Sequence, residues 1–253
     1  MYPELKPGES GHQIESSYTD PDTKVRELIH TEVRAIMARH VERLLENYTI
    51  LTCGVFIKVP GGSTFGLHHH WTVLDDYRKY VINIWCPLQP TTVESGTLHV
   101  LPNTHKIFPE KVSFAYEAGY APYEEALRSK YSRPLISQPG QAAIFDLSLH
   151  HWSSPNTTAE PRIAVHCNCI PAEEKPILLY FDTEHPERFE MYRTTTEFYV
   201  RDLHVPAGTT MVRPTDLEFL GYTPNENRTY TQVEYEEVLS NASEVRRKLY
   251  STP

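Results

Sequence analysis

Apolar residues between positions 20 and 47 recur at steps of three and four, which places them on one side of a helix. Asp20, just ahead of Pro21, offers a cap and a first turn for this helix. The apolar stripe comprises Val25, Leu28, Ile29, Val33, Ile36, Met37, Val41, Leu44 and Leu45. The pattern predicts an amphipathic helix that packs against a sheet.

From residue 50 the pattern changes to short strands separated by turn residues such as Pro60-Gly61-Gly62 and Pro139-Gly140. Many short strands after one helix indicate a closed or sandwiched β architecture. The predicted strands are ILTCGVFIKV (50–59), YVINIWCPL (80–88), TLHVL (97–101), QAAIFDL (141–147), RIAVHCNCI (162–170) and PILLYF (176–181).

The 253 residues fit one large domain. Within it the pattern predicts an arm or lid over 1–19, the helix over 20–47, a barrel core over 50–182 with an insert at 106–133, and an extension over 183–253. The insert reads as helical or irregular, and a last amphipathic helix is expected around 233–250.

The strand RIAVHCNCI has two chemically different faces. Ile163, Val165, Cys167 and Cys169 alternate with Arg162, Ala164, His166 and Asn168. Asn83, between Ile82 and Ile84, repeats the alternation in another strand, which favours a polar barrel interior. The Cys167/Cys169 pair falls on the apolar face, so buried free thiols are favoured over a metal site.

Lys and Arg number 24 and Asp and Glu 33, giving a net charge of −9 with no basic run. This argues against nucleic acid or an anionic membrane as a partner. No apolar stretch approaches the ~20 residues of a membrane span, and the N-terminus lacks the apolar stretch of a signal peptide. We therefore expect a soluble, cytoplasmic protein, and a homodimer stays open.

Histidines cluster at two places, His68-His69-His70 and His150-His151. On a strand, His68 and His70 share a face and His69 points away. Two imidazoles at i and i+2 form half of a transition-metal site, and His151 can supply a third. Two alternatives to a metal site remain: the histidines lie in a solvated loop, or they are hydrogen-bonded within the core.

Two stretches carry a resemblance, LHHHWTVLDDYRKYVINIWCPLQPTTVESGTLHVLPNTH and GQAAIFDLSLHHWSSPNTTAEPRIAV. They resemble the phytanoyl-CoA dioxygenase-like family of iron(II)/2-oxoglutarate oxygenases, over about residues 50 to 182. The resemblance implies a mainly β fold with flanking helices, the double-stranded β-helix (cupin or jelly-roll) barrel. It also implies iron(II) and 2-oxoglutarate.

The family pattern assigns roles to matching residues. His68 and His151 would be iron ligands, and Arg162, eleven residues after His151, would pair with the distal carboxylate of 2-oxoglutarate. Residues implied to line the co-substrate cavity are Asn83, Trp85 and Ser153. The remaining histidines His99, His105 and His166 are expected to be polar cavity or loop residues.

The chain departs from the family at His70, which stands where the family has the aspartate of H-x-D. Asp75 and Asp76 align with an acidic pair downstream and are poor substitutes. The expected ligand set is therefore His68, His70 and His151. Since an imidazole fills the position that halogenating relatives leave open, halogenation is disfavoured.

Three functions compete. The favoured one is an iron(II)- and 2-oxoglutarate-dependent dioxygenase that hydroxylates or desaturates a C–H bond of a small organic molecule with O₂. The second is a three-histidine dioxygenase that acts without 2-oxoglutarate on a metal-chelating substrate, and the third a non-catalytic metal- or ligand-binding paralogue. Arg162 favours the first. The primary substrate cannot be predicted. The segments that select it in this architecture are the 106–133 insert and the C-terminal region, where the motif resemblance ends.

Overall fold

The computed structural model describes residues 15–76, 78–105, 108, 110–113, 119–203 and 212–241. Residues 1–14 of the predicted 1–19 arm, parts of the 106–133 insert and the end of the predicted 233–250 helix, beyond residue 241, lie outside the described residues. Three α-helices flank the sheets, namely α1 (Thr23–Leu44), α2 (Glu124–Tyr131) and α3 (Gln232–Ser240). No helix in these ranges is long and apolar enough to cross a membrane.

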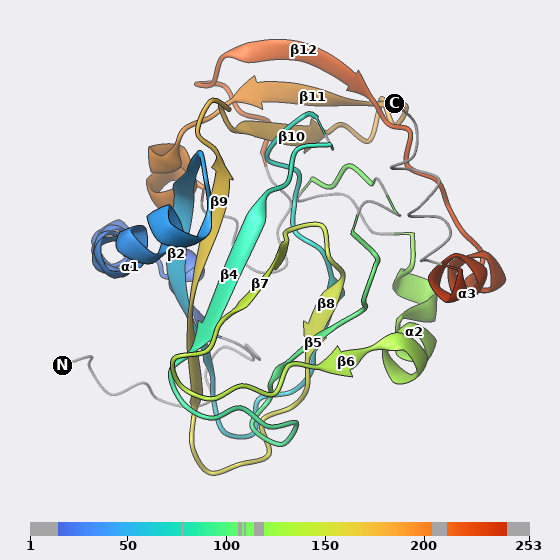
Figure 1. Cartoon of the computed structure of the whole chain (residues 1–253). Coiled ribbons are helices and arrows are strands. Elements are labelled where there is room, and N and C mark those ends of the chain that lie inside the picture. Colours follow the sequence, from blue (N-terminus) through green and yellow to red (C-terminus); the bar gives the residue numbers. More distant parts are fainter. Residues whose placement is uncertain are drawn as a thin grey trace.

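Two antiparallel sheets form the body of the molecule (Figure 1). The five-stranded sheet has the order β1 (Glu15–Ser16), β2 (Tyr48–Lys58), β9 (Arg162–Pro171), β4 (Ile82–Pro87) and β7 (Ala143–Asp146). The four-stranded sheet has the order β3 (Phe65–His68), β8 (His151–Ser153), β5 (Leu98–Val100) and β6 (Arg133–Pro134). From β2 to β9 the chain passes back and forth between the sheets, except that β5 and β6 pair within one sheet, and this is jelly-roll topology. The predicted double-stranded β-helix is confirmed.

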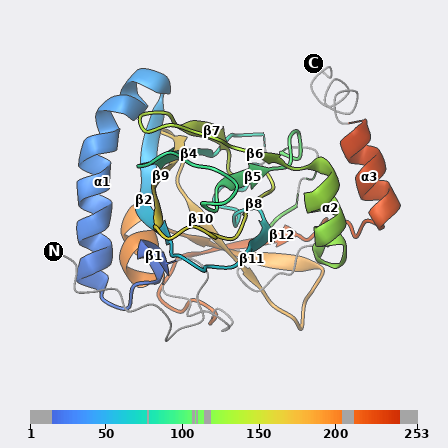
Figure 2. The same cartoon turned by 90° about the horizontal axis from the view of Figure 1, so that it is seen from below.

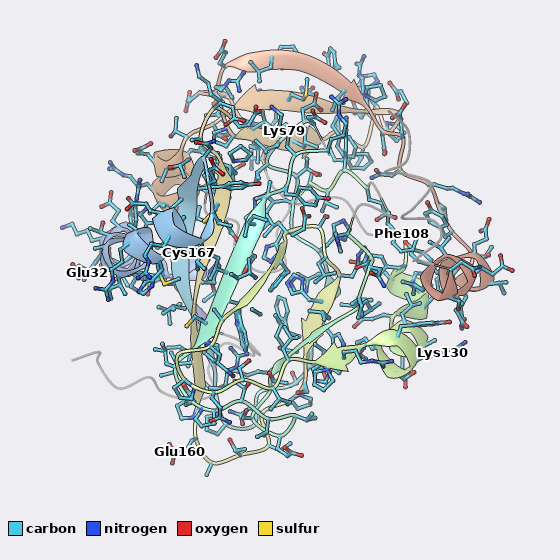
Figure 3. All side chains as sticks on the ribbon, viewed as in Figure 1. Glu32, Lys79, Phe108, Lys130, Glu160 and Cys167 are labelled. Carbon is cyan, nitrogen blue, oxygen red and sulfur yellow. The ribbon has the colours of Figure 1, made fainter. Side chains whose placement is uncertain are left out.

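Helix α1 covers the outer face of the five-stranded sheet, on the opposite side of the molecule from α2 and α3 (Figure 2). Val33, Met37 and Val41 pack against the outward side chains of the sheet, among them Cys53 and Cys167. Figure 3 shows Cys167 on the side of the sheet that faces the helix. The predicted amphipathic helix is thus confirmed. However, three members of its apolar stripe, Leu28, Ile36 and Leu44, are exposed.

The cap of α1 lies two residues beyond the predicted position. Asp22 is the N-cap, and its side chain accepts a hydrogen bond from the Lys24 N–H at 2.9 Å. The Asp20 carboxylate instead accepts from the backbone N–H of Asp22 at 2.8 Å. Asp20 therefore shapes the turn that precedes the helix.

A third sheet, β10 (Ile177–Phe181), β11 (Arg188–Arg193) and β12 (Phe219–Pro224), stands apart from the barrel. The sequence analysis assigned 176–181 to the barrel core, whereas β10 pairs with β11. It found neither β11 nor β12. In β11 the apolar Phe189 and the charged Glu190 are both buried, so the expected alternation of apolar and polar residues is lost. The Glu190 carboxylate is satisfied by the Tyr192 hydroxyl at 2.5 Å and by Arg213 at 2.8 Å.

The segment before α1 closes over one edge of the barrel. Strand β1 pairs with Phe56 and Ile57 of β2, and the Tyr18 ring reaches His166 with ring centroids 5.1 Å apart. Gly54 permits this approach, because a Cβ there would lie 2.8 Å from both Ser17 Oγ and Tyr18 Cε2.

Gly54→Ala should therefore destabilise the fold by about 1–3 kcal/mol, the usual cost of overpacking. Denaturant unfolding measures the change. The matched control is Gly119→Ala, where the nearest heavy atom to the new Cβ is 3.7 Å away. Equal midpoints for both variants would contradict the packing of Tyr18 over Gly54.

Candidate metal centre and carboxylate site

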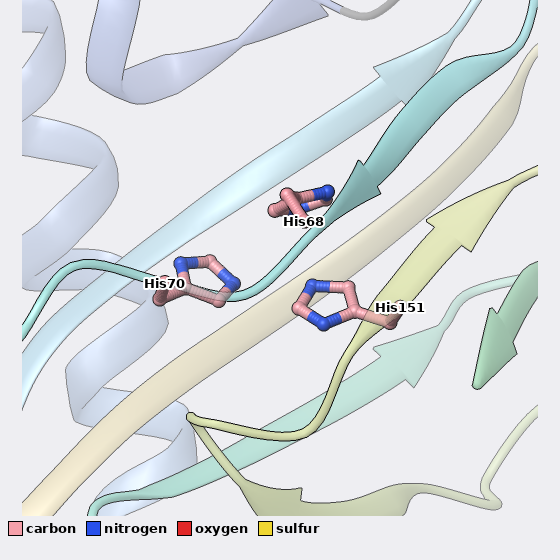
Figure 4. A group of neighbouring side chains, drawn as sticks. All are labelled: His68, His70 and His151. Carbon is pink, nitrogen blue, oxygen red and sulfur yellow. The ribbon is translucent and has the colours of Figure 1, made fainter. Parts of the chain in front are cut away.

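Three histidines meet inside the barrel, from two neighbouring strands of the four-stranded sheet (Figure 4). His68 ends β3 and His151 begins β8, and the two are paired in register. His70 follows two residues after His68. One ring nitrogen from each of the three lies within 4.8 Å of the others. The spacing and the three imidazole donors fit a transition metal such as iron or zinc.

Hydrogen bonds fix the orientation of two of these rings. The Nδ1–H of His68 donates to the Gly66 carbonyl at 2.8 Å, and the Nδ1–H of His151 donates to the Leu149 carbonyl at 2.7 Å. Since a carbonyl can only accept, both Nδ1 atoms carry the proton. The Nε2 lone pairs are left for a metal, as is usual for metal-binding histidines.

Burial keeps the three rings uncharged. It lowers the pKa of His68, and it lowers the pKa values of His70 and His151 well below the ordinary range. Neighbouring histidines lower the last two further, above all His68. Neutral imidazole is the form that binds a metal, so the site needs no deprotonation near neutral pH.

No carboxylate joins this cluster among the described residues. Asp75 forms an ion pair with Lys111 at 3.2 Å, and Asp76 pairs with Arg78 at 2.9 Å. Both aspartates are thus engaged elsewhere, in agreement with the prediction that they are poor substitutes for a ligand.

His69 and His150 point away from the metal cluster and form a second, buried group with each other. Their ring centroids are 4.5 Å apart, and His69 Nδ1 lies 3.3 Å from the Tyr120 hydroxyl. On this side a cavity of about 250 Å³ is lined by His69 and Glu110 and reaches His70. The sequence analysis predicted the direction of His69 and named His150 beside His151. It did not predict the group that these two form with Tyr120, nor the cavity, because their segments have no regular period.

Arg162 is buried inside the barrel, and its guanidinium is only partly hydrogen-bonded. It is 2% exposed, its Nε and Nη2 donate to the Gly96 carbonyl at 3.3 and 3.1 Å, and its Nη1 has no partner. Burial lowers its pKa to about 10, so it stays charged at neutral pH. The charged guanidinium therefore has unused donors at Nη1, and such donors can bind a carboxylate.

The other predicted cavity residues also face the interior. The Trp85 ring centroid lies 5.6 Å from Arg162 Cζ, and Ser153 is buried on the inner side of β8. Asn83 donates to Asn168 Oδ1 at 3.0 Å, while its own Oδ1 has no partner. His166 is 1% exposed, and neither of its ring nitrogens has a hydrogen-bond partner.

Two further histidines lie on β5 or directly after it. His99 stacks on Trp152 with ring centroids 4.1 Å apart, and His105 lies in the turn after β5. The sequence analysis missed Lys58, which is fully buried and donates to Ser153 Oγ at 2.7 Å. Strand alternation places Lys58 on the same face as Thr52 and Phe56. This alternation could have indicated from the sequence that Lys58 points inward.

The chain is similar in sequence to a dioxygenase, and similar in structure to proteins that are described as dependent on 2-oxoglutarate or were solved with it. Dioxygenase lolE1 of Epichloe uncinata is 31% identical over 108 residues, which cover 43% of this chain and 40% of that protein. The α-ketoglutarate-dependent carbocyclase SnoK from nogalamycin biosynthesis is similar in structure, with TM-score 0.47, 16% identity and 65% of each chain covered. EctD from S. alaskensis, solved with 2-oxoglutarate and 5-hydroxyectoine, has TM-score 0.44 and 16% identity over 77% of this chain and 65% of its own.

The match to lolE1 thus spans less than half of that relative's length. The family comparison covers more of the chain, because the model of the family described as Phytanoyl-CoA dioxygenase (PhyH) matches residues 8–164. This range contains β2 to β8, all three histidines of the metal cluster and Arg162. The chain belongs to the phytanoyl-CoA dioxygenase family.

Proposed function

We propose that this protein is an iron(II)- and 2-oxoglutarate-dependent oxygenase that hydroxylates or desaturates a C–H bond of a small organic molecule. The observation that carries the proposal is the pairing, in one barrel, of a three-histidine cluster with a buried arginine that has a free donor edge. Family membership supports the same reaction class.

His68, His70 and His151 hold the metal through neutral ring nitrogens. When bound, iron(II) supplies the redox chemistry that activates O₂. The carbonyls of Gly66 and Leu149 keep the rings of His68 and His151 in the ligating orientation. The residues of the chain thus supply the ligands and fix their orientation.

Arg162 and Ser153 bind the distal carboxylate of 2-oxoglutarate. Arg162 contributes the Nη1 edge, and Ser153 contributes its hydroxyl from the inner side of β8. Trp85 and Asn83 line the same interior from β4. The Asn83 Oδ1, which has no partner, adds an acceptor for a bound molecule.

The primary substrate occupies the cavity of about 250 Å³ beside His70. Small-molecule sites commonly measure ~300–1,000 Å³, so this volume favours a small substrate. Phe108 supplies an apolar wall and Glu110 a polar one. Burial raises the pKa of Glu110 to about 7, and its Oε2 has no partner.

The first prediction concerns metal binding. His68→Ala and His151→Ala should lose stoichiometric iron(II), because each removes one of three ligands. His69→Ala is the matched control and should keep iron, since its ring faces Tyr120 instead. Metal analysis of the folded variants measures the difference. Equal iron loss in all three would contradict the assigned ligand set.

The second prediction concerns the co-substrate. Arg162→Leu should weaken 2-oxoglutarate binding at least tenfold, since a charge-assisted bond contributes about 1.5–3 kcal/mol, and leave the iron content unchanged. Arg78→Leu, at a surface ion pair, is the control. Calorimetric titration measures both. Turnover of O₂ by the wild type with no 2-oxo acid present would instead favour the three-histidine dioxygenase that acts on a chelating substrate.

The third prediction concerns His70. His70→Asp restores the family's motif, but the shorter side chain should bind iron more weakly in this geometry and lose most activity. His70→Ala should uncouple 2-oxoglutarate decay from product formation. Succinate formation in wild type and both variants measures the effect. A silent wild type beside an active His70→Asp would identify a non-catalytic paralogue and overturn the proposed function.

A further inference from the structure

The cavity beside His70 has more acidic than basic side chains in its lining. The acidic residues are Asp75, Asp76, Glu110, Asp146 and Glu226, and the basic ones are Lys79 and Lys111. Both lysines already have acidic partners, because Lys79 pairs with Glu174 and Lys111 pairs with Asp75. The described lining therefore offers no unpaired lysine to an anionic ligand, and its excess of negative charge favours a cation.

Glu110 differs from three of the other carboxylates in this lining. Asp75 and Asp76 form ion pairs, and Asp146 accepts a hydrogen bond from a backbone N–H at 2.8 Å. Glu110 forms no ion pair with a described residue. Its Oε1 accepts a hydrogen bond from the Tyr235 hydroxyl at 3.1 Å, and its Oε2 is buried without a partner. A buried carboxylate is normally paired, so Glu110 needs a partner that a ligand can bring.

Aromatic rings lie next to this carboxylate. Phe108 lies beside α3 (Figure 3), and its ring centroid is 4.7 Å from that of Tyr235 and 5.3 Å from that of Tyr230. Phe108 and Trp71 also line the cavity. The faces of aromatic rings attract cations, and such rings form the usual cages for ammonium groups. A carboxylate among aromatic rings at a cavity thus matches a protonated amine better than a neutral hydroxyl group.

Glu110 changes its charge near neutral pH. Burial raises its pKa to about 7, and the hydrogen bond from Tyr235 partly offsets this effect. The other titratable groups close to it are phenols whose pKa values burial raises, so they stay neutral: Tyr120, Tyr230 and Tyr235. The adjacent Lys111 is held in its own ion pair. A bound cation would therefore favour the ionised form of Glu110 and displace its proton.

We propose that Glu110 is the counter-ion of a protonated amine, so that the primary substrate is a small molecule with a basic nitrogen. This inference rests on the proposed function and adds the class of the primary substrate. Because Glu110 and His70 line the same cavity, an amine held by Glu110 directs the rest of its molecule toward the metal cluster. Tyr235 is a positioning residue, since its hydroxyl holds the carboxylate.

The experiment compares small ligands in matched sets. Each set keeps one ring or chain and changes one substituent, as in cyclohexylamine, cyclohexanol and cyclohexanecarboxylate. The ligands are titrated calorimetrically into anaerobic protein loaded with iron(II) and 2-oxoglutarate. An amine should bind at least about tenfold more tightly than its alcohol, because its hydrogen bond to Glu110 is charge-assisted on both sides. The carboxylate should bind most weakly.

A variant without the charge tests the residue itself. Glu110→Gln keeps the shape of the side chain and should remove the preference for the amine over the alcohol. Glu27→Gln, at a surface ion pair on α1, is the matched control and should keep the preference of the wild type.

The pH dependence gives a test that needs no variant. Amine affinity should rise from about pH 6 to about pH 8, because Glu110 loses its proton through a pKa of about 7. An alkylamine stays charged over this range, like the lysine side chain with its pKa of ~10.4. Alcohol affinity should not rise. Tyr235→Phe removes a hydrogen bond that lowers the Glu110 pKa, so it should shift the amine profile to higher pH.

Amines that bind no more tightly than their alcohols in every set would overturn this inference and leave the proposed function standing. So would a preference for the amine that Glu110→Gln retains, or an amine affinity that does not change between these pH values. A wild-type protein that binds iron(II) but not 2-oxoglutarate would overturn the proposed function, whichever ligand the cavity prefers.

Discussion

The antiparallel pairing of β2 with β9 is the constraint on which the rest of the molecule depends. Its register fixes which side chains of both strands face α1 and which face the barrel interior. Cys53 and Cys167 pack outward against the helix, while Lys58 and Arg162 point inward. A shift of one residue would exchange the two sets, burying charges in the apolar layer and exposing the sulfur atoms to the interior. The apolar packing of α1 therefore also holds the interior site in place.

The interior contains more polar atoms than its own residues satisfy. Arg162 Nη1, Asn83 Oδ1 and both nitrogens of His166 are buried without a partner. Each such atom costs about 1–3 kcal/mol if nothing replaces the lost water, which is large beside the ~5–15 kcal/mol that stabilise a typical domain. Bound molecules, whether ordered water, metal or co-substrate, account for such an arrangement. The unpartnered polar atoms of the interior therefore indicate that it binds a molecule or an ion.

The sequence predicted the regular parts of this arrangement and missed the irregular ones. Helix α1, the barrel strands β2, β4, β5, β7 and β9, and the separation of His68 and His70 from His69 follow from periodicity, because burial repeats at fixed steps along each element. Strand β11 was missed because Glu190 is buried beside Phe189 and is neutralised by Arg213, a contact that no local pattern contains. Lys58 was missed for a related reason. Its position on the strand is regular. Its pairing with Arg162, which lies more than a hundred residues later in the sequence, can be seen only in the folded chain.

His70 and Lys58 change the charge of the interior in the same direction. The family's H-x-D motif places a carboxylate beside the metal, whereas His70 contributes a neutral ring, so the charge of a divalent metal is not reduced by its protein ligands. Lys58, when protonated, adds a positive charge beside Arg162, its register partner. Among the described residues no carboxylate joins the three-histidine cluster, and none pairs with Lys58 or Arg162, so a ligand can bring negative charge to both places. A 2-oxo dicarboxylate has one carboxylate for each end, and a monocarboxylate would leave one end uncompensated. The electrostatics of the protein thus favour a doubly charged co-substrate more strongly than a site with the usual aspartate would.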